Sequence, residues 1–321
     1  MSATPTLTSA RAGGAGAPAP VRARRSASRR LEDVTKVLFV VPAALALVAL
    51  FGYPVVKNVL MSFQDYGLKT FFTGKAPFVG IANYATVISD GVFSKAVVNT
   101  ALFTLGSIVG QFVLGMLLAL FFHRSFPLSG VVRALFLLPW LLPLIVGSAA
   151  WRAILEQDSG ILNVTLQDLG VVDGPVPWLT SPSVALIAVI LVNIWLGIPF
   201  NLTLLYSGLQ DIPDELYEAG ALDGATGWRA FWEITWPNLR PVVSVVLMLG
   251  VIYTLKVLDI ILGLTQGGPA NATQTIALQS YQRSFVEFKF GEGAALSNIL
   301  IVVSLVFAAI YLRANRRQVD E

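Results

Sequence analysis

Cysteine is absent from this 321-residue sequence, and histidine occurs once, as His123. Without cysteine the chain can form neither disulfides nor thiolate metal sites, and a single imidazole excludes a histidine-rich metal cluster. Charge is also scarce, because Asp, Glu, Lys and Arg make up only 13% of the residues, against about 25% in soluble domains. The net charge of +3 is too small to indicate nucleic-acid binding. The composition therefore favours an integral membrane protein.

Apolar length is abundant instead, since 55% of the residues are hydrophobic. Six segments are long enough to cross a hydrocarbon core of about 30 Å as helices, the form that satisfies backbone polar groups in lipid. We predict an all-α integral membrane protein with one membrane domain at residues 37–313. Its six spans are expected at residues 37–56, 97–122, 134–151, 184–209, 242–264 and 294–312.

Residues 1–36 and 314–321 flank this domain. The first segment ends in a cluster of arginines and could be the basic region of a signal peptide. The apolar run after it exceeds the roughly 7–15 residues of a signal peptide, and five more spans follow, so we predict a disordered tail. Arginines also cluster after the second span and near the C-terminus. By the positive-inside rule both termini and the loop at 210–241 lie in the cytoplasm, and the acidic segment 154–182 faces outward.

The loop between the fourth and fifth spans begins with a helix-start pattern. Asp211 precedes Pro213, and the acids Asp214 and Glu215 follow. An Asp cap, an early proline and acids in the first turn all favour a helix N-terminus. Gly224 can then supply the left-handed residue that ends the helix.

A second short helix is predicted after Gly224, with Thr226 as its cap and Pro237 and Pro241 ending it before the fifth span. At helical spacing its large side chains share one face. That face would comprise Trp228, Phe231, Trp232 and Thr235. Its aromatic residues need an apolar partner, which could be the chain's own helices, another protein or the membrane interface.

This loop resembles the EAA loop of membrane permeases from ATP-binding cassette (ABC) importers, through which ATP hydrolysis on a partner chain moves the membrane helices. The resemblance is carried by Glu218, Ala219, Ala221, Asp223, Gly224, Ala225, Ile234 and Pro237. Two residues depart from the family pattern: Gly220 replaces the second alanine of the triplet, and Trp236 replaces a leucine. Glycine should loosen the first helix by up to about 1 kcal/mol relative to alanine.

Further segments resemble carbohydrate-type permeases in the same order along the chain. They are residues 78–84, Asn99-Thr100, Arg133, 138–140, Trp151, 160–163 and 259–269. The last segment ends in Leu-Thr-Gln-Gly-Gly-Pro and resembles the end of the fifth span in the maltose- and glycerol-phosphate-type permeases. There it belongs to the first permease subunit, which works beside a second, different permease.

The resemblance implies a type I ABC importer permease fold with cytoplasmic coupling helices. It implies binding-protein-dependent transport of a sugar, oligosaccharide or related compound by alternating access. The expected partners are a homologous second permease, a dimer of ATP-binding subunits that carries ATP and Mg, an extracytoplasmic solute-binding protein and the carbohydrate. Glu218 would anchor the coupling helix through a charge-assisted hydrogen bond or ion pair. The other implied coupling residues are Ala219, Gly220, Asp223, Gly224, Trp228, Phe231, Ile234 and Pro237.

Neither a phosphate loop nor a catalytic pair is evident in the sequence. The nearest match runs from Gly67 to Gly74-Lys75, but six residues separate the glycines where the motif has four, and Ala76 stands where Ser or Thr is needed. With one histidine and no cysteine, a nucleophile–base pair is not apparent either. We therefore expect no catalytic residue, metal or cofactor on this chain.

A sugar path across the membrane needs polar and aromatic side chains within the spans. Lys256 and Asp259 are charges in the fifth span, and either they neutralise each other on one helix face or they contact the substrate. The other candidates are Asn99, Gln111, Asn193, Trp195, Asn201 and Tyr253. Gly106 and Gly110 are predicted to serve close helix packing instead.

Two other classes compete with the importer hypothesis: a secondary transporter and a channel, neither driven by ATP. Both would leave the loop at 211–236 without a purpose, because only an importer needs an ATPase bound there. The predicted location is the bacterial cytoplasmic membrane.

Overall fold

The computed structural model describes residues 38–124 and 126–315, and all regular elements in these ranges are helices. The chain divides into two compact units, residues 1–56 and 57–321. Of the predicted tails, residues 1–36 and 316–321 lie outside the described residues. Residues 314 and 315 end a helix.

The first unit holds most of an apolar helix that runs from Leu38 to Ser62. It includes a π-helical stretch, η1 (Val48–Gly52), and continues as α2 (Tyr53–Ser62), which crosses into the second unit. Its apolar side chains in the first unit are largely exposed. Such a helix is suited to lipid rather than water.

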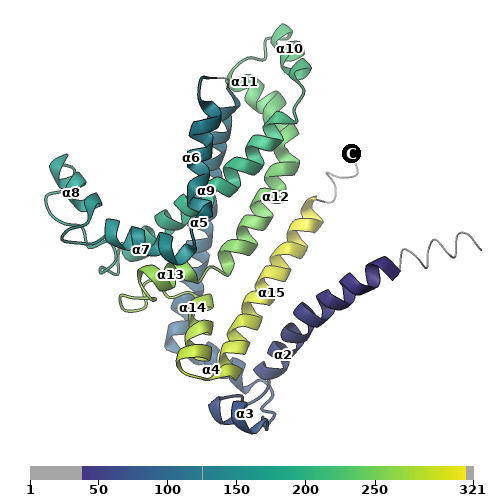
Figure 1. Cartoon of the computed structure of the whole chain (residues 1–321), viewed down its shortest axis with the longest axis vertical. Coiled ribbons are helices and arrows are strands. Elements are labelled where there is room, and N and C mark those ends of the chain that lie inside the picture. Colours follow the sequence, from purple (N-terminus) through teal and green to yellow (C-terminus); the bar gives the residue numbers. More distant parts are fainter. Residues whose placement is uncertain (1–37, 125, 316–321) are drawn as a thin grey trace, which may run out of the picture. The chain divides into compact units, whose positions relative to one another are not determined.

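Two long helices, α5 (Gly91–His123) and α9 (Ala185–Gln210), form the core of the second unit (Figure 1). They pack closely because α5 carries glycines where α9 approaches. A methyl group at Gly110 would collide with the side chain of Ile194, and one at Gly106 would come within 3.3 Å of Ile190. This confirms the prediction that the two glycines serve helix packing.

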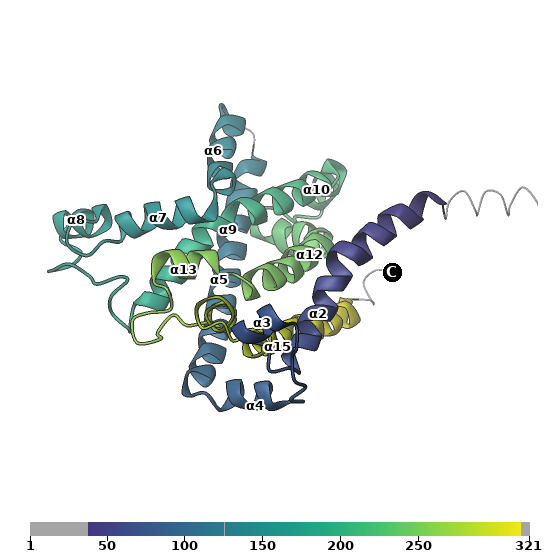
Figure 2. The same ribbon diagram turned by 60° about the horizontal axis from the view of Figure 1, so that its bottom comes forward.

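Two further apolar helices complete the unit: α12 (Trp236–Leu255) packs against both, and α15 (Phe290–Asn315) packs against α12. Shorter elements connect the long helices. They are α3 (Leu68–Thr73), α4 (Ala82–Ser89), α8 (Ile161–Asp168), α10 (Asp214–Leu222), α11 (Trp228–Ala230), η2 (Phe231–Thr235), α13 (Asp259–Leu264), α14 (Ile276–Tyr281) and η3 (Gln282–Val286). Figure 1 places α10 and α11 at one end of the second unit and α3 and α4 at the other, and Figure 2 is turned so that the end with α3 and α4 comes forward. We call these the α10 end and the α4 end.

The segment predicted as a single third span at 134–151 is broken. It consists of α6 (Ser129–Leu141) and α7 (Leu144–Ile154), whose axes differ by 101°. Pro143 explains the break, because proline lacks an N–H and disfavours helical geometry at the residue before it. Leu142 is accordingly extended, with ψ at 135°. The described helices therefore give five straight candidate spans, or six if the bent pair counts as one.

The prediction that Pro237 and Pro241 separate a short helix from the fifth span is wrong. A helix runs without interruption from Trp228 to Leu255 through both prolines. It widens into the π-helical η2, which ends at Thr235, shortly before Pro237. Asn238 Nδ2 also donates to the Ile234 carbonyl at 2.7 Å. A π-helical turn shifts the register of the backbone hydrogen bonds, which allows the helix to continue past proline.

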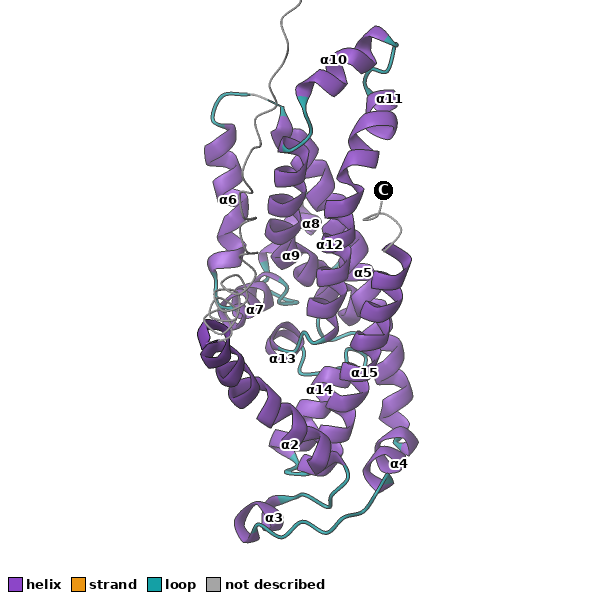
Figure 3. Ribbon diagram, turned by 90° about the vertical axis from the view of Figure 1, so that its right-hand side faces the viewer, coloured by secondary structure: helices purple, strands orange, loops and turns teal. Residues whose placement is uncertain are grey.

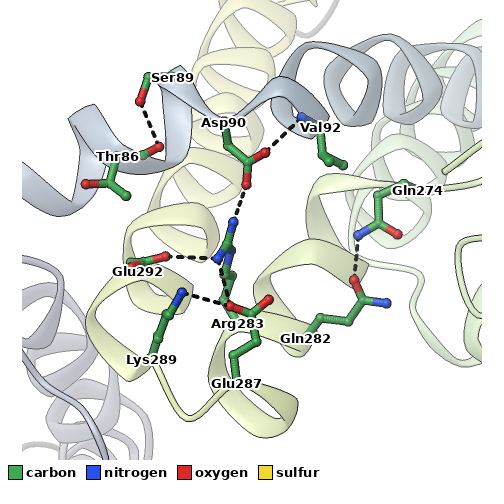
Figure 4. Close-up of polar contacts among 10 residues, drawn as sticks. All are labelled: Thr86, Ser89, Asp90, Val92, Gln274, Gln282, Arg283, Glu287, Lys289 and Glu292. Atoms are coloured by element: carbon green, nitrogen blue, oxygen red, sulfur yellow. Dashed lines mark hydrogen bonds and ion pairs between the residues drawn. The ribbon is translucent and has the colours of Figure 1, made fainter. Parts of the chain in front are cut away.

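At the α4 end, Arg283 on η3 joins the start of α5 to the start of α15 (Figure 4). Its guanidinium pairs with Asp90, with Glu287 at 2.7 Å and with Glu292 at 3.4 Å. Asp90 also caps α5 by accepting from the Val92 N–H at 2.9 Å. Burial opposes the charge, but these carboxylates outweigh it and raise the pKa of Arg283 above its ordinary value.

Replacing Arg283 with glutamine should lower the free energy of unfolding by about 2 kcal/mol, since it leaves half-buried carboxylates without their partner. The Arg283 side chain is 17% exposed. A matched control is Arg229→Gln, because Arg229 and Glu233 are 60% and 50% exposed and a solvent-exposed pair contributes little to stability. Thermal unfolding of the purified variants would measure both. Equal losses would contradict the assigned role of Arg283.

Candidate functional site

The first helix of the polar loop, α10, begins later than predicted. Asp211 caps the C-terminus of α9, and Pro213 precedes α10 without a side-chain capping bond. The start of α10 is instead favoured by the acids in its first turn, Asp214 and Glu215. Its end agrees with the prediction, because Gly224 has a left-handed φ of +79°.

The helix after α10 starts at Trp228, and its N-cap is Gly227 rather than the predicted Thr226. Its aromatic residues pack on one another. The Trp228 and Phe231 rings stack with centroids 5.3 Å apart, and Trp232 lies edge-on to both. Trp228 remains 72% exposed and Trp232 49% exposed. The cluster is therefore only partly covered by the described chain.

Two contacts hold α10 against this helix. The Tyr217 and Thr235 hydroxyls are hydrogen-bonded at 3.0 Å. The second contact is at Gly220, where an added methyl group would strike the end of the Ile234 side chain. The departure of Gly220 from the family triplet thus makes room for Ile234.

This contact predicts a coupled effect on stability. Gly220→Ala alone should change the free energy of unfolding little, since its helix propensity gain of about 1 kcal/mol is offset by displacement of Ile234. In an Ile234→Val background the obstructing atom is gone, so the same change should stabilise the chain by about 0.5–1 kcal/mol. A double-mutant cycle of thermal unfolding would measure the coupling. Additive effects would mean that the two residues do not obstruct each other.

A cavity of about 760 Å³ opens at the α10 end between α5, α10 and the helix that starts at Trp228. Three predicted coupling residues, Glu218, Trp228 and Phe231, line it together with Leu120, His123, Arg124, Leu209, Asp214, Tyr217, Gly227, Ala230 and Thr235. Glu218 is exposed, and within the described chain it has no ion-pair partner.

The remaining predicted coupling residues lie beside this cavity. Ala219 and Gly220 are on α10, Asp223 and Gly224 end it, and Ile234 and Pro237 are on the following helix. Sequence reasoning missed Leu222, which ends α10 and is 90% exposed. Nothing in the sequence around Leu222 indicates that its apolar side chain is exposed. Together α10 and the aromatic cluster present several carboxylates and apolar side chains to solvent.

A second cavity, of about 390 Å³, lies where α5, α9 and α12 meet. Three predicted path residues, Gln111, Asn193 and Tyr253, line it with Trp140, Leu144, Leu196, Gly197, Phe200, Gly250, Thr254, Val257 and Ile260. Sequence reasoning missed Trp140 and Phe200, whose rings lie 6.3 Å apart, because nothing local distinguishes them from other apolar residues in spans.

The two side-chain amides that line this cavity, those of Gln111 and Asn193, differ in their hydrogen bonding. Gln111 Nε2 donates to the Asn193 carbonyl at 2.9 Å. The Asn193 amide nitrogen is buried without a hydrogen-bond partner among the described residues. An unpaired buried donor is costly, and this one belongs to a residue that lines the cavity.

Two predicted path residues, Asn99 and Asn201, do not line this cavity, and their side-chain amides donate to backbone carbonyls instead. Asn99 Nδ2 donates to the carbonyls of Asn271 and Gln274 at 3.2 and 3.0 Å, which fastens α5 to the loop after α13. Asn201 Nδ2 donates to the Gly197 carbonyl at 3.0 Å within α9.

The remaining predicted path residues, Trp195, Lys256 and Asp259, also lie outside the cavity lining. Trp195 packs edge-on to Trp151 at 5.4 Å. The prediction that Lys256 and Asp259 share a helix face is wrong, since α12 ends at Leu255 and Asp259 starts α13. The Lys256 ammonium lies 4.9 Å from the Tyr253 ring centre instead, and no ion pair joins it to Asp259 in the described structure.

Comparison with known proteins gives a consistent result. Residues 111–319 match the family described as "Binding-protein-dependent transport system inner membrane component". The trehalose/maltose transport system permease protein MalF of Thermococcus litoralis is 37% identical over 249 residues, which cover 78% of this chain and 83% of the relative. The diacetylchitobiose uptake system permease protein DasB of Streptomyces coelicolor is 31% identical over 303 residues, covering 93% and 92%.

The fold is also similar to that of a solved structure. A chain from a bacterial ABC transporter involved in the import of the acidic polysaccharide alginate superposes with a TM-score of 0.77 at 22% identity. The match covers 90% of this chain and 99% of that one. At this identity the likeness concerns the fold.

Proposed function

The chain belongs to the family of binding-protein-dependent transport system inner membrane components, and from that premise we propose that it moves a sugar or oligosaccharide. It is a permease subunit of an ABC importer and not an enzyme, because the ATPase is a separate partner chain. The named relatives transport trehalose and maltose or take up diacetylchitobiose. All of these are saccharides, which supports the proposed cargo.

The α10 end is the proposed docking surface for the ATPase. The observation that carries this proposal is the pairing of an exposed, unpartnered Glu218 with the exposed Leu222 on one short helix. A carboxylate can form a charge-assisted hydrogen bond with a partner, and a protruding leucine can fill an apolar pocket. ATP and Mg would be held by the partner, and α10 would transmit its closure to α9 and α12.

The second cavity is the proposed sugar site. Its aromatic residues Trp140, Phe200 and Tyr253 offer apolar faces to a sugar ring, and Gln111 and Asn193 offer amide groups to hydroxyls. Alternating access would expose this cavity first to the solute-binding protein and then to the α10 end.

Orientation follows from the same scheme. With the α10 end against the ATPase, that end is cytoplasmic, and the α4 end faces the solute-binding protein. Residues 37–313 would then form the permease domain, in the cytoplasmic membrane of a bacterium, with both termini on the cytoplasmic side. The arginine distribution supports this arrangement.

The test is ATP hydrolysis and uptake by the complex reconstituted in proteoliposomes with its second permease, ATPase and binding protein. Maltose, trehalose and diacetylchitobiose would be supplied in turn. We expect hydrolysis and uptake to rise together with the cognate saccharide and its binding protein. Uptake that proceeds without ATP would instead support a secondary transporter or channel, and a response to amino acids alone would contradict a saccharide cargo.

A further inference from the structure

Residues 63–81, which we call the α3 loop, connect α2 to α4 and form a closed structure at the α4 end (Figure 3). The two ends of the loop are joined by backbone hydrogen bonds. The Asp65 N–H donates to the Pro77 carbonyl at 2.9 Å, and the Val79 N–H donates to the Phe63 carbonyl at 2.8 Å. Thr70 Oγ1 donates to the Asp65 carbonyl at 3.0 Å and fixes α3 within the loop. The loop therefore presents its side chains in a defined arrangement.

Those side chains are strongly apolar on one side. Phe71, Phe72 and Phe78 are 61%, 78% and 77% exposed. On a helix with about 100° per residue, Leu68, Phe71 and Phe72 fall on one face, while Lys69 and Thr73 fall beside it. An exposed apolar surface of this kind, outside the membrane spans, indicates an interaction.

The position of the loop relative to α15 indicates its depth in the membrane. The Gly291 N–H donates to the Tyr66 carbonyl at 2.9 Å, and the Phe71 and Phe290 rings lie 6.1 Å apart. Phe290 begins an apolar helix of 24 residues. At a rise of 1.5 Å per residue this helix is about 36 Å long, which exceeds a hydrocarbon core of about 30 Å. Its first turn, and the α3 loop with it, therefore lies at the boundary between acyl chains and headgroups.

Two lysines flank the aromatic face. Lys69 and Lys75 are exposed, and neither forms an ion pair with any described residue. Phenylalanines beside unpaired lysines are the pattern of a segment that lies in a lipid interface and attracts anionic headgroups. The apolar surface also continues onto the neighbouring Phe288, which is 46% exposed.

We propose that the α3 loop is a lipid-binding anchor. The Phe71, Phe72 and Phe78 side chains enter the acyl-chain boundary, and Lys69 and Lys75 bind the phosphate groups of anionic lipid. The anchor fixes the ends of α2 and α15 at one depth. The competing occupant is the solute-binding protein, which approaches the same end under the proposed orientation.

The cysteine-free sequence allows a direct test with single spin labels on the assembled complex in proteoliposomes. The variants are Phe72→Cys and, as a matched control on the next residue of α3, Thr73→Cys. We expect the ratio of oxygen to nickel-chelate accessibility at position 72 to exceed that at position 73 by about threefold or more, because oxygen concentrates among acyl chains. A ratio at position 72 as low as that of a label in water would overturn the proposal. So would a label at position 72 that becomes shielded from both reagents only when the binding protein is added.

The lysines have their own test. In vesicles containing phosphatidylglycerol, the melting temperature of the complex should exceed that in phosphatidylcholine alone. The double variant Lys69→Gln with Lys75→Gln should lose most of this difference, and a matched Lys256→Gln variant should keep it. An unchanged lipid dependence in the double variant would show that these lysines do not bind the headgroups.

Discussion

Glu218→Ala should reduce sugar uptake by about tenfold or more, because a charge-assisted hydrogen bond to the ATPase contributes about 1.5–3 kcal/mol of docking free energy. The structure motivates this expectation, since Glu218 lines the cavity at the α10 end and has no ion-pair partner among the described residues. Removing it should therefore leave the stability of the isolated chain nearly unchanged. The measurement is saccharide-stimulated ATP hydrolysis and uptake by the reconstituted complex.

The matched control is Glu215→Ala, because Glu215 lies on the same helix, is also exposed and does not line the cavity. It should retain most of the uptake.

Leu222→Ser provides a second probe of the docking surface and should weaken ATPase binding without unfolding the chain, since the leucine is 90% exposed. Normal uptake in the Glu218 variant would remove α10 from the coupling mechanism.

Asn193→Leu should make the chain more stable while it lowers transport. The substitution keeps the shape of the side chain and removes a buried amide nitrogen that has no hydrogen-bond partner in the described structure. Relief of that unpaired donor should raise the free energy of unfolding by about 1 kcal/mol. Loss of a hydrogen bond to a sugar hydroxyl should lower uptake by about tenfold, which corresponds to about 1.4 kcal/mol.

Asn201→Leu on the same helix is the matched control. Asn201 already donates to the Gly197 carbonyl and does not line the cavity, so its replacement should reduce stability and leave substrate selectivity unchanged. Thermal unfolding and uptake at several sugar concentrations would separate the two effects. If Asn193→Leu destabilises the chain and leaves uptake unaffected, Asn193 is a packing residue and the cavity is not the sugar path.

The sequence by itself determined the membrane class and the loop that carries α10. Apolar length is a local property, so the spans could be recognised without knowing their neighbours. Gly224 could be assigned as a helix end because a left-handed backbone favours glycine wherever it occurs. Glu218 and its neighbours could be matched to the EAA loop by resemblance, since the whole motif lies within one short segment.

The tertiary structure alone decided which polar residues face a cavity. Asn99 and Asn193 look alike as amides within apolar helices, yet Asn99 is bound to two loop carbonyls far along the chain and Asn193 is left unpaired. The effect of a proline on its helix could not be predicted from the sequence either. Pro143 breaks a helix, whereas Pro237 is accommodated by the π-helical turn before it. In each case the outcome depends on what backbone or side-chain partner lies nearby, and the residue type does not contain that information.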